Sequence, residues 1–309
     1  MPSAESEETM TTKKDAMFHS AASEVVTPFT KDGEIDGALL SDEIGFMLDK
    51  GVAGIFVNGL ASEFLMLTEK ERRFAADTVI RAAAGRVPVV GNIYANSTAA
   101  ALEQAAMYKE LGADAVMIFT PYIYPYTRRG MFEYCDAIGR LCGLPVYICN
   151  AYDSINKFPP SLVAEIFAKN PAFRGYKDGT QNIIEQQRLI DLVGTDRHFE
   201  LIAGSDAQIV TTMMLGGLGV ISLITVVFPE LIVKTVAAAE SGDFKEATRL
   251  QAKVIRVREG IKKGPFMAAY KYVARKTGHP LGYMRHPLIE VSAEDAEAID
   301  AVMISENMY

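Results

Sequence analysis

A lysine at the end of a predicted strand is the residue with the clearest capacity for covalent chemistry. Lys177 follows Tyr176 at the end of the predicted strand 174–177. The alternation of side chains along a β-strand would hold its ammonium group above an apolar interior. Burial lowers the pKa of a lysine, and the neutral amine can attack a ketone to form an imine. Position alone leaves two structural alternatives open, in which the side chain extends to solvent or pairs with Asp178.

A glycine-containing segment offers a second chemical group, which is a set of backbone amides. Gly59 lies between Asn58 and Leu60, and it allows the backbone to approach a ligand so that the following amides could bind a carboxylate. Glu63 in the same segment has three interpretations: a buried structural acid, an exposed charge at a helix start, or a catalytic group. We favour the structural role.

The segments that carry these residues alternate between two patterns. Short apolar or β-branched runs, typical of strands, are separated by longer runs of helical periodicity, as in repeated βα units around a parallel sheet. The predicted strands cover residues 24–27, 54–58, 87–92, 115–120, 146–150, 174–177, 201–204 and 220–223. Eight strands with intervening helices favour an α/β fold of the closed (β/α)8 TIM barrel type over an open doubly wound sheet.

Helical periodicity continues after the eighth predicted strand, over residues 231–240, 243–259, 265–277 and 293–304. We therefore divide the chain into a flexible N-terminal tail (1–20), the barrel (21–241) and a C-terminal helical extension (242–309). In such a barrel the chemistry belongs at the C-terminal ends of the strands. Lys177 and the segment after Gly59 both fall there.

The composition indicates a globular protein with a small-molecule partner. The 309 residues are 49% hydrophobic and carry a net charge of -8, which argues against a nucleic-acid partner or an anionic membrane surface. Cys135, Cys142 and Cys149 lack the spacing of a zinc site, so we expect reduced thiols and a cytoplasmic location. The sequence shows neither an apolar run long enough for a membrane span nor a signal-sequence pattern.

Five motifs follow one another in the order of a known family: VTPF at 26–29, NGLASEF at 58–64, FTPY at 119–122, GYKDG at 175–179 and GGLGVIS at 216–222. This set resembles the dihydrodipicolinate synthase and N-acetylneuraminate lyase family, and the resemblance extends from Glu24 to residues 285–288. It implies a TIM barrel with a C-terminal helical extension, usually tetrameric. The sixth-strand lysine, here Lys177, would form an imine with pyruvate or a related 2-oxo acid.

The sequence departs from the family motifs where the substrate is handled. The family usually has Gly-Thr-Thr-Gly-Glu where residues 59–63 read GLASE, so the hydroxyls that hold the pyruvyl carboxylate are missing. Cys149 and Ile123 match the two tyrosines of the family's proton relay, and Ser154 matches the arginine that binds aspartate semialdehyde. Four phenols could replace the missing tyrosine: Tyr122, Tyr124, Tyr147 and Tyr152.

The sequence therefore predicts a lyase that forms an imine between Lys177 and a 2-oxo acid and then makes or breaks a bond at the β carbon. The reaction would be that of a pyruvate-type aldolase or a sugar-acid dehydratase. Cys149 joins Lys177 in the predicted catalytic site, either as a proton relay or as a small residue that enlarges the pocket. The predicted substrate-binding residues are Gly59, Ala61, Ser62, Asn150 and Ile221.

Two other functions stay open from sequence, and both keep the same imine platform. The chain could be a true dihydrodipicolinate synthase, or it could be a catalytically silent paralogue that binds a 2-oxo acid. Neither a metal nor a diffusible cofactor is implied. We expect a homo-oligomer, either a tetramer or a dimer.

Overall fold

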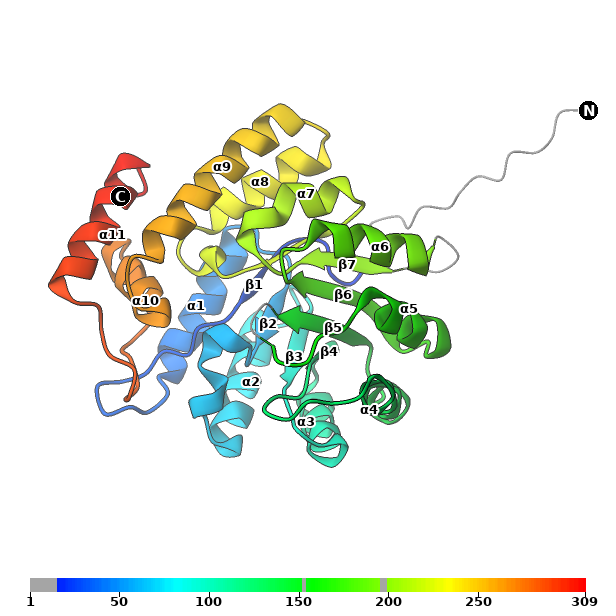
Figure 1. Ribbon diagram of the computed structural model, residues 1–309. Coiled ribbons are helices and arrows are strands. Elements are labelled where there is room, and N and C mark those ends of the chain that lie inside the picture. Colours follow the sequence, from blue (N-terminus) through cyan, green and yellow to red (C-terminus); the bar gives the residue numbers. More distant parts are fainter. Residues whose placement is uncertain (1–15, 152–153, 195–198) are drawn as a thin grey trace, which may run out of the picture.

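The computed structural model describes residues 16–151, 154–194 and 199–309. Within these residues, eight parallel strands close into a barrel in which each strand pairs with the next and the last pairs with the first (Figure 1). The strands are β1 (Ser20–Glu24), β2 (Ile55–Val57), β3 (Val89–Ile93), β4 (Ala115–Phe119), β5 (Val146–Ala151), β6 (Phe173–Gly179), β7 (Glu200–Ala203) and β8 (Gly219–Ser222). The (β/α)8 TIM barrel predicted from the sequence is confirmed.

Eight α-helices alternate with the strands in the described residues and surround the barrel. They are α1 (Gly37–Asp49), α2 (Glu69–Ala83), α3 (Thr98–Leu111), α4 (Arg128–Leu141), α5 (Pro160–Lys169), α6 (Ile183–Val193), α7 (Ile209–Met214) and α8 (Pro229–Glu240). Local sequence sets their ends. Thr68 and Glu71 form a capping box at the start of α2, and Gly112 ends α3 with a positive φ of 86°.

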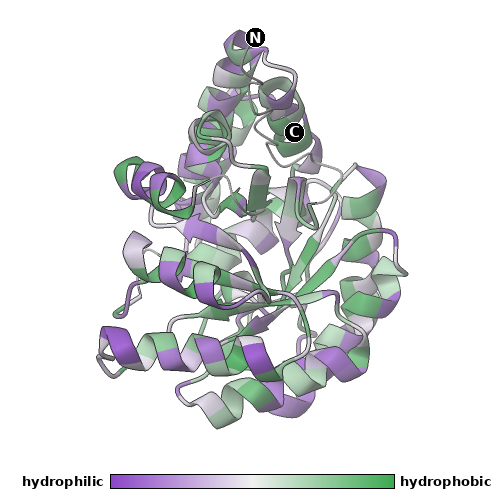
Figure 2. Cartoon of the chain, turned by 90° about the vertical axis from the view of Figure 1, so that its right-hand side faces the viewer, coloured by the Kyte–Doolittle hydropathy of each residue, from purple (hydrophilic) through white to green (hydrophobic). Residues whose placement is uncertain are grey.

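The core has two layers that follow the alternation of the strands. Along β4, Ala115, Met117 and Phe119 point into the barrel, and Val116 and Ile118 pack against the helices outside. Figure 2 shows the strands mostly in hydrophobic colours, whereas the helices carry both hydrophobic and hydrophilic residues. The barrel is therefore a packed core, and a ligand can bind only at one of its ends.

Three helices follow the barrel: α9 (Phe244–Ile261), α10 (Phe266–Lys276) and α11 (Ala293–Ser305). α9 packs against α7 and α8, and it also contacts α10 and α11 (Figure 1). This C-terminal helical extension was predicted from the sequence. None of the helices in the described ranges has the length and apolar character of a membrane span.

The start of the barrel differs from the prediction. We expected the first strand at 24–27, but β1 ends at Glu24, and the Val26 N–H donates to the side chain of Glu43 in α1. The predicted tail also ended too late. Phe18 is 2% exposed, and its N–H and that of Met17 donate to Glu200. Residues 1–15 of the predicted tail lie outside the described residues.

Candidate active site

Lys177 lies inside the barrel near the C-terminal end of β6. Its Cα pairs in register with Cys149 of β5 and with Ile202 of β7. The residue is 3% exposed, and its Nζ lies 4.9 Å from the centre of the Phe56 ring. A cation over an aromatic face is stabilised by the ring quadrupole. The apolar floor predicted beneath this lysine is therefore present.

The partner of Lys177 is Glu24, which sequence reasoning missed. Glu24 is the last residue of β1, and its Oε1 forms an ion pair with Lys177 Nζ. The exposed fractions of the two side chains are 12% and 4%. Glu24 follows Ala22 on the inward face of the strand, and a charged residue on that face was a usable signal. The predicted strand 24–27 begins at Glu24, so it does not include the alternation from Ala22 that places this carboxylate inside the barrel.

The Glu24 carboxylate changes the state of the lysine. Burial is the largest single influence and lowers the pKa of Lys177, but the charge of Glu24, aided by Cys149 and Asp206, outweighs it and raises the pKa above its ordinary value. The expectation that burial alone makes the amine neutral is therefore wrong. Asp178, the other predicted partner, instead accepts hydrogen bonds from Thr180 and from glutamine side chains.

Cys149 also faces the interior, next to Lys177. Burial raises the pKa of its thiol to about 12, although the positive charge of Lys177 opposes this shift. A thiol with this pKa stays protonated at neutral pH and is a poor proton relay. The environment of Cys149 favours our interpretation that the small side chain enlarges the pocket.

A pocket of about 830 Å³ opens above these residues. Lys177, Glu24, Cys149 and Ile221, a predicted substrate-binding residue, are among the residues that line it. Its upper walls come from loops after several strands and from the C-terminal extension, with Phe119, Asp206, Arg258, Lys262, Phe266 and Tyr270 among the lining residues. The extension thus completes the site, a contribution that the sequence did not predict.

Two polar groups of the predicted carboxylate-binding segment already form hydrogen bonds within the protein. The Ala61 N–H donates to Glu24 Oε2 at 3.3 Å. A Cβ at Gly59 would come within 2.6 Å of the Phe56 ring, so a residue without a side chain is required there. Ser62 is 1% exposed, and its hydroxyl donates to the Val25 carbonyl at 2.6 Å. The predicted substrate contact of the Ser62 hydroxyl is therefore wrong.

Asn150 does not face the pocket, because it follows Cys149 on the opposite side of β5. Its side chain bonds to the backbone of Phe158 in both directions, with N–O distances of 3.2 and 3.3 Å. This pair holds the segment after β5 in place. The prediction that Asn150 orients the substrate is contradicted by this geometry.

The four candidate phenols are placed differently. Tyr147 lies deeper than Cys149, and its hydroxyl donates to Glu200 at 2.5 Å, toward the opposite end of the barrel. Tyr122 stacks on Tyr94, and Tyr124 is 67% exposed. Tyr152 lies outside the described residues. None of the three described phenols is among the residues that line the pocket beside Lys177.

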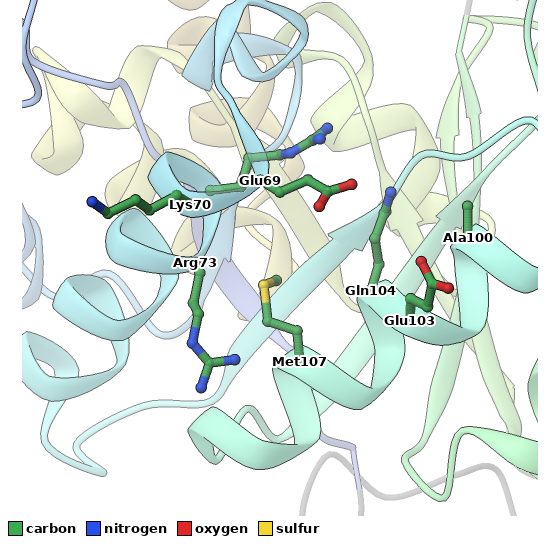
Figure 3. Close-up of a pocket in the computed structure, with 8 residues that line it drawn as sticks. Glu69, Lys70, Arg73, Ala100, Glu103, Gln104 and Met107 are labelled. Atoms are coloured by element: carbon green, nitrogen blue, oxygen red, sulfur yellow. The ribbon is translucent and has the colours of Figure 1, made fainter.

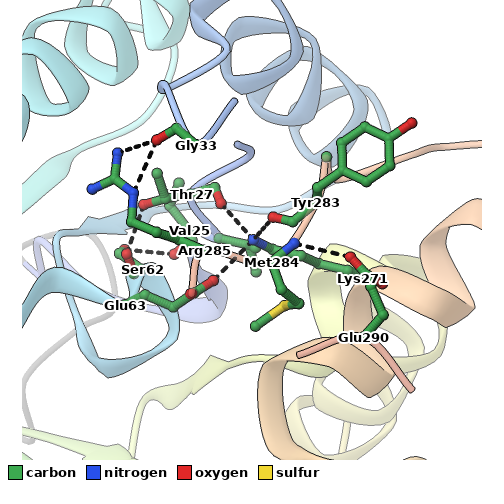
Figure 4. A network of polar contacts seen from close by, with 12 residues as sticks. Val25, Thr27, Gly33, Ser62, Glu63, Lys271, Tyr283, Met284, Arg285 and Glu290 are labelled. Atoms are coloured by element: carbon green, nitrogen blue, oxygen red, sulfur yellow. Dashed lines mark hydrogen bonds and ion pairs between the residues drawn. The ribbon is translucent and has the colours of Figure 1, made fainter. Parts of the chain in front are cut away.

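Glu63 has the structural role that we favoured. Its carboxylate lies 2.9 Å from Lys271 Nζ of α10, and both side chains are almost fully buried. Lys271 also donates to the carbonyls of Thr27 and Tyr283 (Figure 4). Burial lowers the pKa of Lys271 and raises that of Glu63. The network connects the C-terminal extension with the segments after β1 and β2.

A second pocket, of about 360 Å³, lies between α2 and α3 on the outside of the barrel (Figure 3). Charged and polar side chains surround it, including Glu69 and Arg73 of α2 and Glu103 of α3. It contains no lysine that is buried against a carboxylate. In the described part of the chain, no group of three or more His, Cys, Asp or Glu side chains could hold a metal ion.

A TIM barrel with a buried lysine near the C-terminal end of its sixth strand defines a class of enzyme that can work through a lysine imine. Comparison with known proteins gives the family. Residues 17–305 match the model of the dihydrodipicolinate synthetase family, so the chain belongs to that family. The family supports a lyase, and the sequence-based recognition of this family is confirmed.

Individual relatives agree with this assignment. The chain is 31% identical to a 4-hydroxy-tetrahydrodipicolinate synthase of Jannaschia sp. (strain CCS1), over 93% of this chain and 98% of the relative. It is 29% identical to an uncharacterized DapA-like lyase of Halobacterium salinarum, over 92% of each chain.

Solved structures share the fold. Dihydrodipicolinate synthase from Aquifex aeolicus superposes with a TM-score of 0.89 at 25% identity, over 94% of this chain and 99% of the other. YagE, a prophage protein from E. coli K12 solved in complex with pyruvate, superposes with a TM-score of 0.91 at 23% identity, over 95% of this chain and 100% of the other.

Proposed function

We propose that the protein is a lyase that forms an imine between Lys177 and a 2-oxo acid and then makes or breaks a bond at the β carbon of the bound acid. The observation that carries this proposal is the burial of Lys177 above Phe56, within a large pocket at the catalytic end of the barrel. An imine withdraws electrons from the adjacent carbon and stabilises the carbanion of an aldol cleavage or a dehydration.

The pocket supports a substrate larger than pyruvate. Cys149 leaves space where the family usually has tyrosine, and the pocket measures about 830 Å³. Arg258 of α9 and Lys262, the residue that follows α9, contribute positive charge to its wall, which suits an anionic substrate. We therefore favour a pyruvate-type aldolase or sugar-acid dehydratase, and we retain Gly59 and Ala61 as backbone contacts and Ile221 as an apolar wall for the ketone side.

Reductive trapping tests the proposal. Pyruvate and a panel of longer 2-oxo acids, each with borohydride, should add one reduced 2-oxo acid group to the wild-type protein, as measured by intact mass and peptide mapping. Lys177→Ala should lose the adduct. If this variant trapped pyruvate with the wild-type stoichiometry, Lys177 would not be the imine lysine.

Dihydrodipicolinate synthase activity is the second candidate, favoured by the names of several relatives. We expect very slow condensation of pyruvate with aspartate semialdehyde, because Cys149, Ile123 and Ser154 replace the family side chains that serve that reaction. Turnover like that of an ordinary synthase in a coupled assay would establish the second candidate. Trapping without turnover of any tested 2-oxo acid would support a silent binding paralogue.

We further propose a cytoplasmic homo-oligomer, either a tetramer or a dimer. Three free, buried cysteines support a reducing compartment. Ile123 and Tyr124, which are 62% and 67% exposed, form an apolar surface after β4 that a second subunit could cover. Sedimentation at several protein concentrations measures the oligomeric state, and a monomer at every concentration would contradict this part of the proposal.

A further inference from the structure

Imine formation requires a group that moves protons at Lys177. The ammonium must lose a proton before the nitrogen attacks, and the carbinolamine hydroxyl must gain one before it leaves as water. Cys149 replaces the family's tyrosine, and its thiol is held in the protonated form. Tyr147 is directed toward Glu200 instead. Another residue must therefore carry these protons.

The carboxylate of Glu24 is in place to do so. Oε1 contacts the lysine nitrogen directly, and Oε2 accepts the Ala61 N–H at 3.3 Å. The backbone amide therefore orients the carboxylate, with one oxygen toward the loop and the other toward the reacting nitrogen. Gly59 lies beside this carboxylate and leaves room for the Phe56 ring below the lysine, because a Cβ added to this residue would lie 2.6 Å from the ring.

We propose that Glu24 is the general acid–base residue that forms and hydrolyses the imine on Lys177. This inference rests on the proposed function of the lysine and adds a residue from another strand to its chemistry. A general acid or base has to be within hydrogen-bond reach of the proton that it transfers. Among the residues that line the pocket, Glu24 meets this condition at Lys177 Nζ through its direct contact.

The proton transfers balance over the whole reaction. Glu24 first takes a proton from the Lys177 ammonium, and the neutral amine forms a bond to the carbonyl carbon while the carbonyl π electrons move to oxygen. Glu24 gives its proton to that oxygen and takes one from the new nitrogen cation, which yields the carbinolamine. Glu24 then protonates the hydroxyl, the C–O bond breaks, water leaves, and the nitrogen lone pair forms the C=N bond of the iminium.

The charge of the buried pair is the same before and after these steps. An ammonium faces a carboxylate at the start, and an iminium faces the same carboxylate at the end, so no buried charge is left without a partner. Other ionisable groups also act on this pair. Cys149 of β5 and Asp206 before α7 act on Lys177. Asp178 of β6 acts on Cys149, and Arg258 of α9 acts on Asp206 and on Tyr270 of α10.

The test measures the rate at which pyruvate and cyanoborohydride add a reduced pyruvyl group to the intact protein. Glu24→Gln keeps the shape of the side chain but cannot exchange protons, and its trapping rate should fall about 100-fold. Glu63→Gln is the matched control, because it removes a buried carboxylate from a different Glu–Lys pair. This control should trap at a rate close to that of the wild type.

A small acid distinguishes proton transfer from a structural role. In Glu24→Ala, added formate should enter the vacated space and restore the trapping rate in proportion to its concentration. A wild-type rate for Glu24→Gln, or a slow Glu24→Ala protein that formate does not accelerate, would overturn the role of Glu24. In contrast, the absence of any adduct in the wild type, or an adduct in Lys177→Ala, would refute the imine on Lys177 itself.

Discussion

The thiol of Cys149 lies next to Lys177 in the pairing of β5 with β6. Because burial keeps this thiol protonated, we interpret its small size, rather than its acidity, as the property that matters. Cys149→Ser should therefore trap pyruvate and longer 2-oxo acids within a few-fold of the wild-type rates. Cys149→Tyr should still trap pyruvate but lose the longer acids, because the ring fills the space that they need.

Trapping rates for each acid with the two variants check this prediction. If the thiol is instead a proton relay, the trapping rate of Cys149→Ser should fall about 100-fold with every acid, pyruvate included. Cys149→Tyr would then recover activity, since it restores a phenol. The two interpretations are separated by the size dependence of the effect.

At the scale of secondary-structure elements, an ion pair between Lys271 and Glu63 connects α10 to the segment after β2. Both side chains are almost fully buried, and their charged atoms are 2.9 Å apart. Removing one partner leaves the other charge without compensation, which costs about 3 to 5 kcal/mol in buried pairs. We therefore expect Lys271→Met to lower the free energy of unfolding by about 3 kcal/mol, as measured by urea denaturation.

The double variant Lys271→Met, Glu63→Gln provides the control for this prediction. Glutamine carries no charge, so the double variant should lose clearly less stability than the sum of the two single losses. Additive losses would mean that the two side chains act independently, and the ion pair would then not be the link between the extension and the barrel.

At the scale of the whole molecule, Glu43 makes stability depend on pH. It lies on α1 and is fully buried, its Oε1 accepts the Val26 N–H at 2.9 Å, and burial raises its pKa to about 8. The folded protein keeps this proton up to about pH 8, whereas the unfolded chain releases it near the ordinary value of 4.5. The folded state therefore binds more protons between these values, and its stability falls as the pH rises through this range.

Denaturation by urea at several pH values between 4.5 and about 8 measures this effect. The contribution of Glu43 to the slope is about 1.4 kcal/mol per pH unit. Glu43→Gln still accepts the Val26 N–H but does not titrate, so the difference in stability between wild type and variant should change with pH by this amount. Parallel pH curves for the two proteins would show that Glu43 is not protonated in the folded state.

Sequence patterns determined the architecture and the position of the lysine. Continuous apolar runs such as β4 and the helical repeats between them specify a barrel, because an apolar strand has to be covered on both faces. Along each strand, successive side chains alternate between these two faces. The same alternation placed Lys177 inside the barrel and Cys149 beside it. These features depend on residues that are neighbours in the chain or in the next strand. Local sequence patterns can therefore predict them.

Only the tertiary structure decided which side chains meet across the barrel and which already have hydrogen-bond partners within the protein. Glu24 and Lys177 are 153 residues apart in sequence, and their contact depends on barrel closure between β8 and β1. The sequence predicted that Ser62 and Asn150 bind the substrate. In the structure, their side chains donate hydrogen bonds to the backbone carbonyls of Val25 and Phe158. Periodicity specifies the face on which a side chain lies, whereas its hydrogen-bond partners depend on the three-dimensional packing of distant segments.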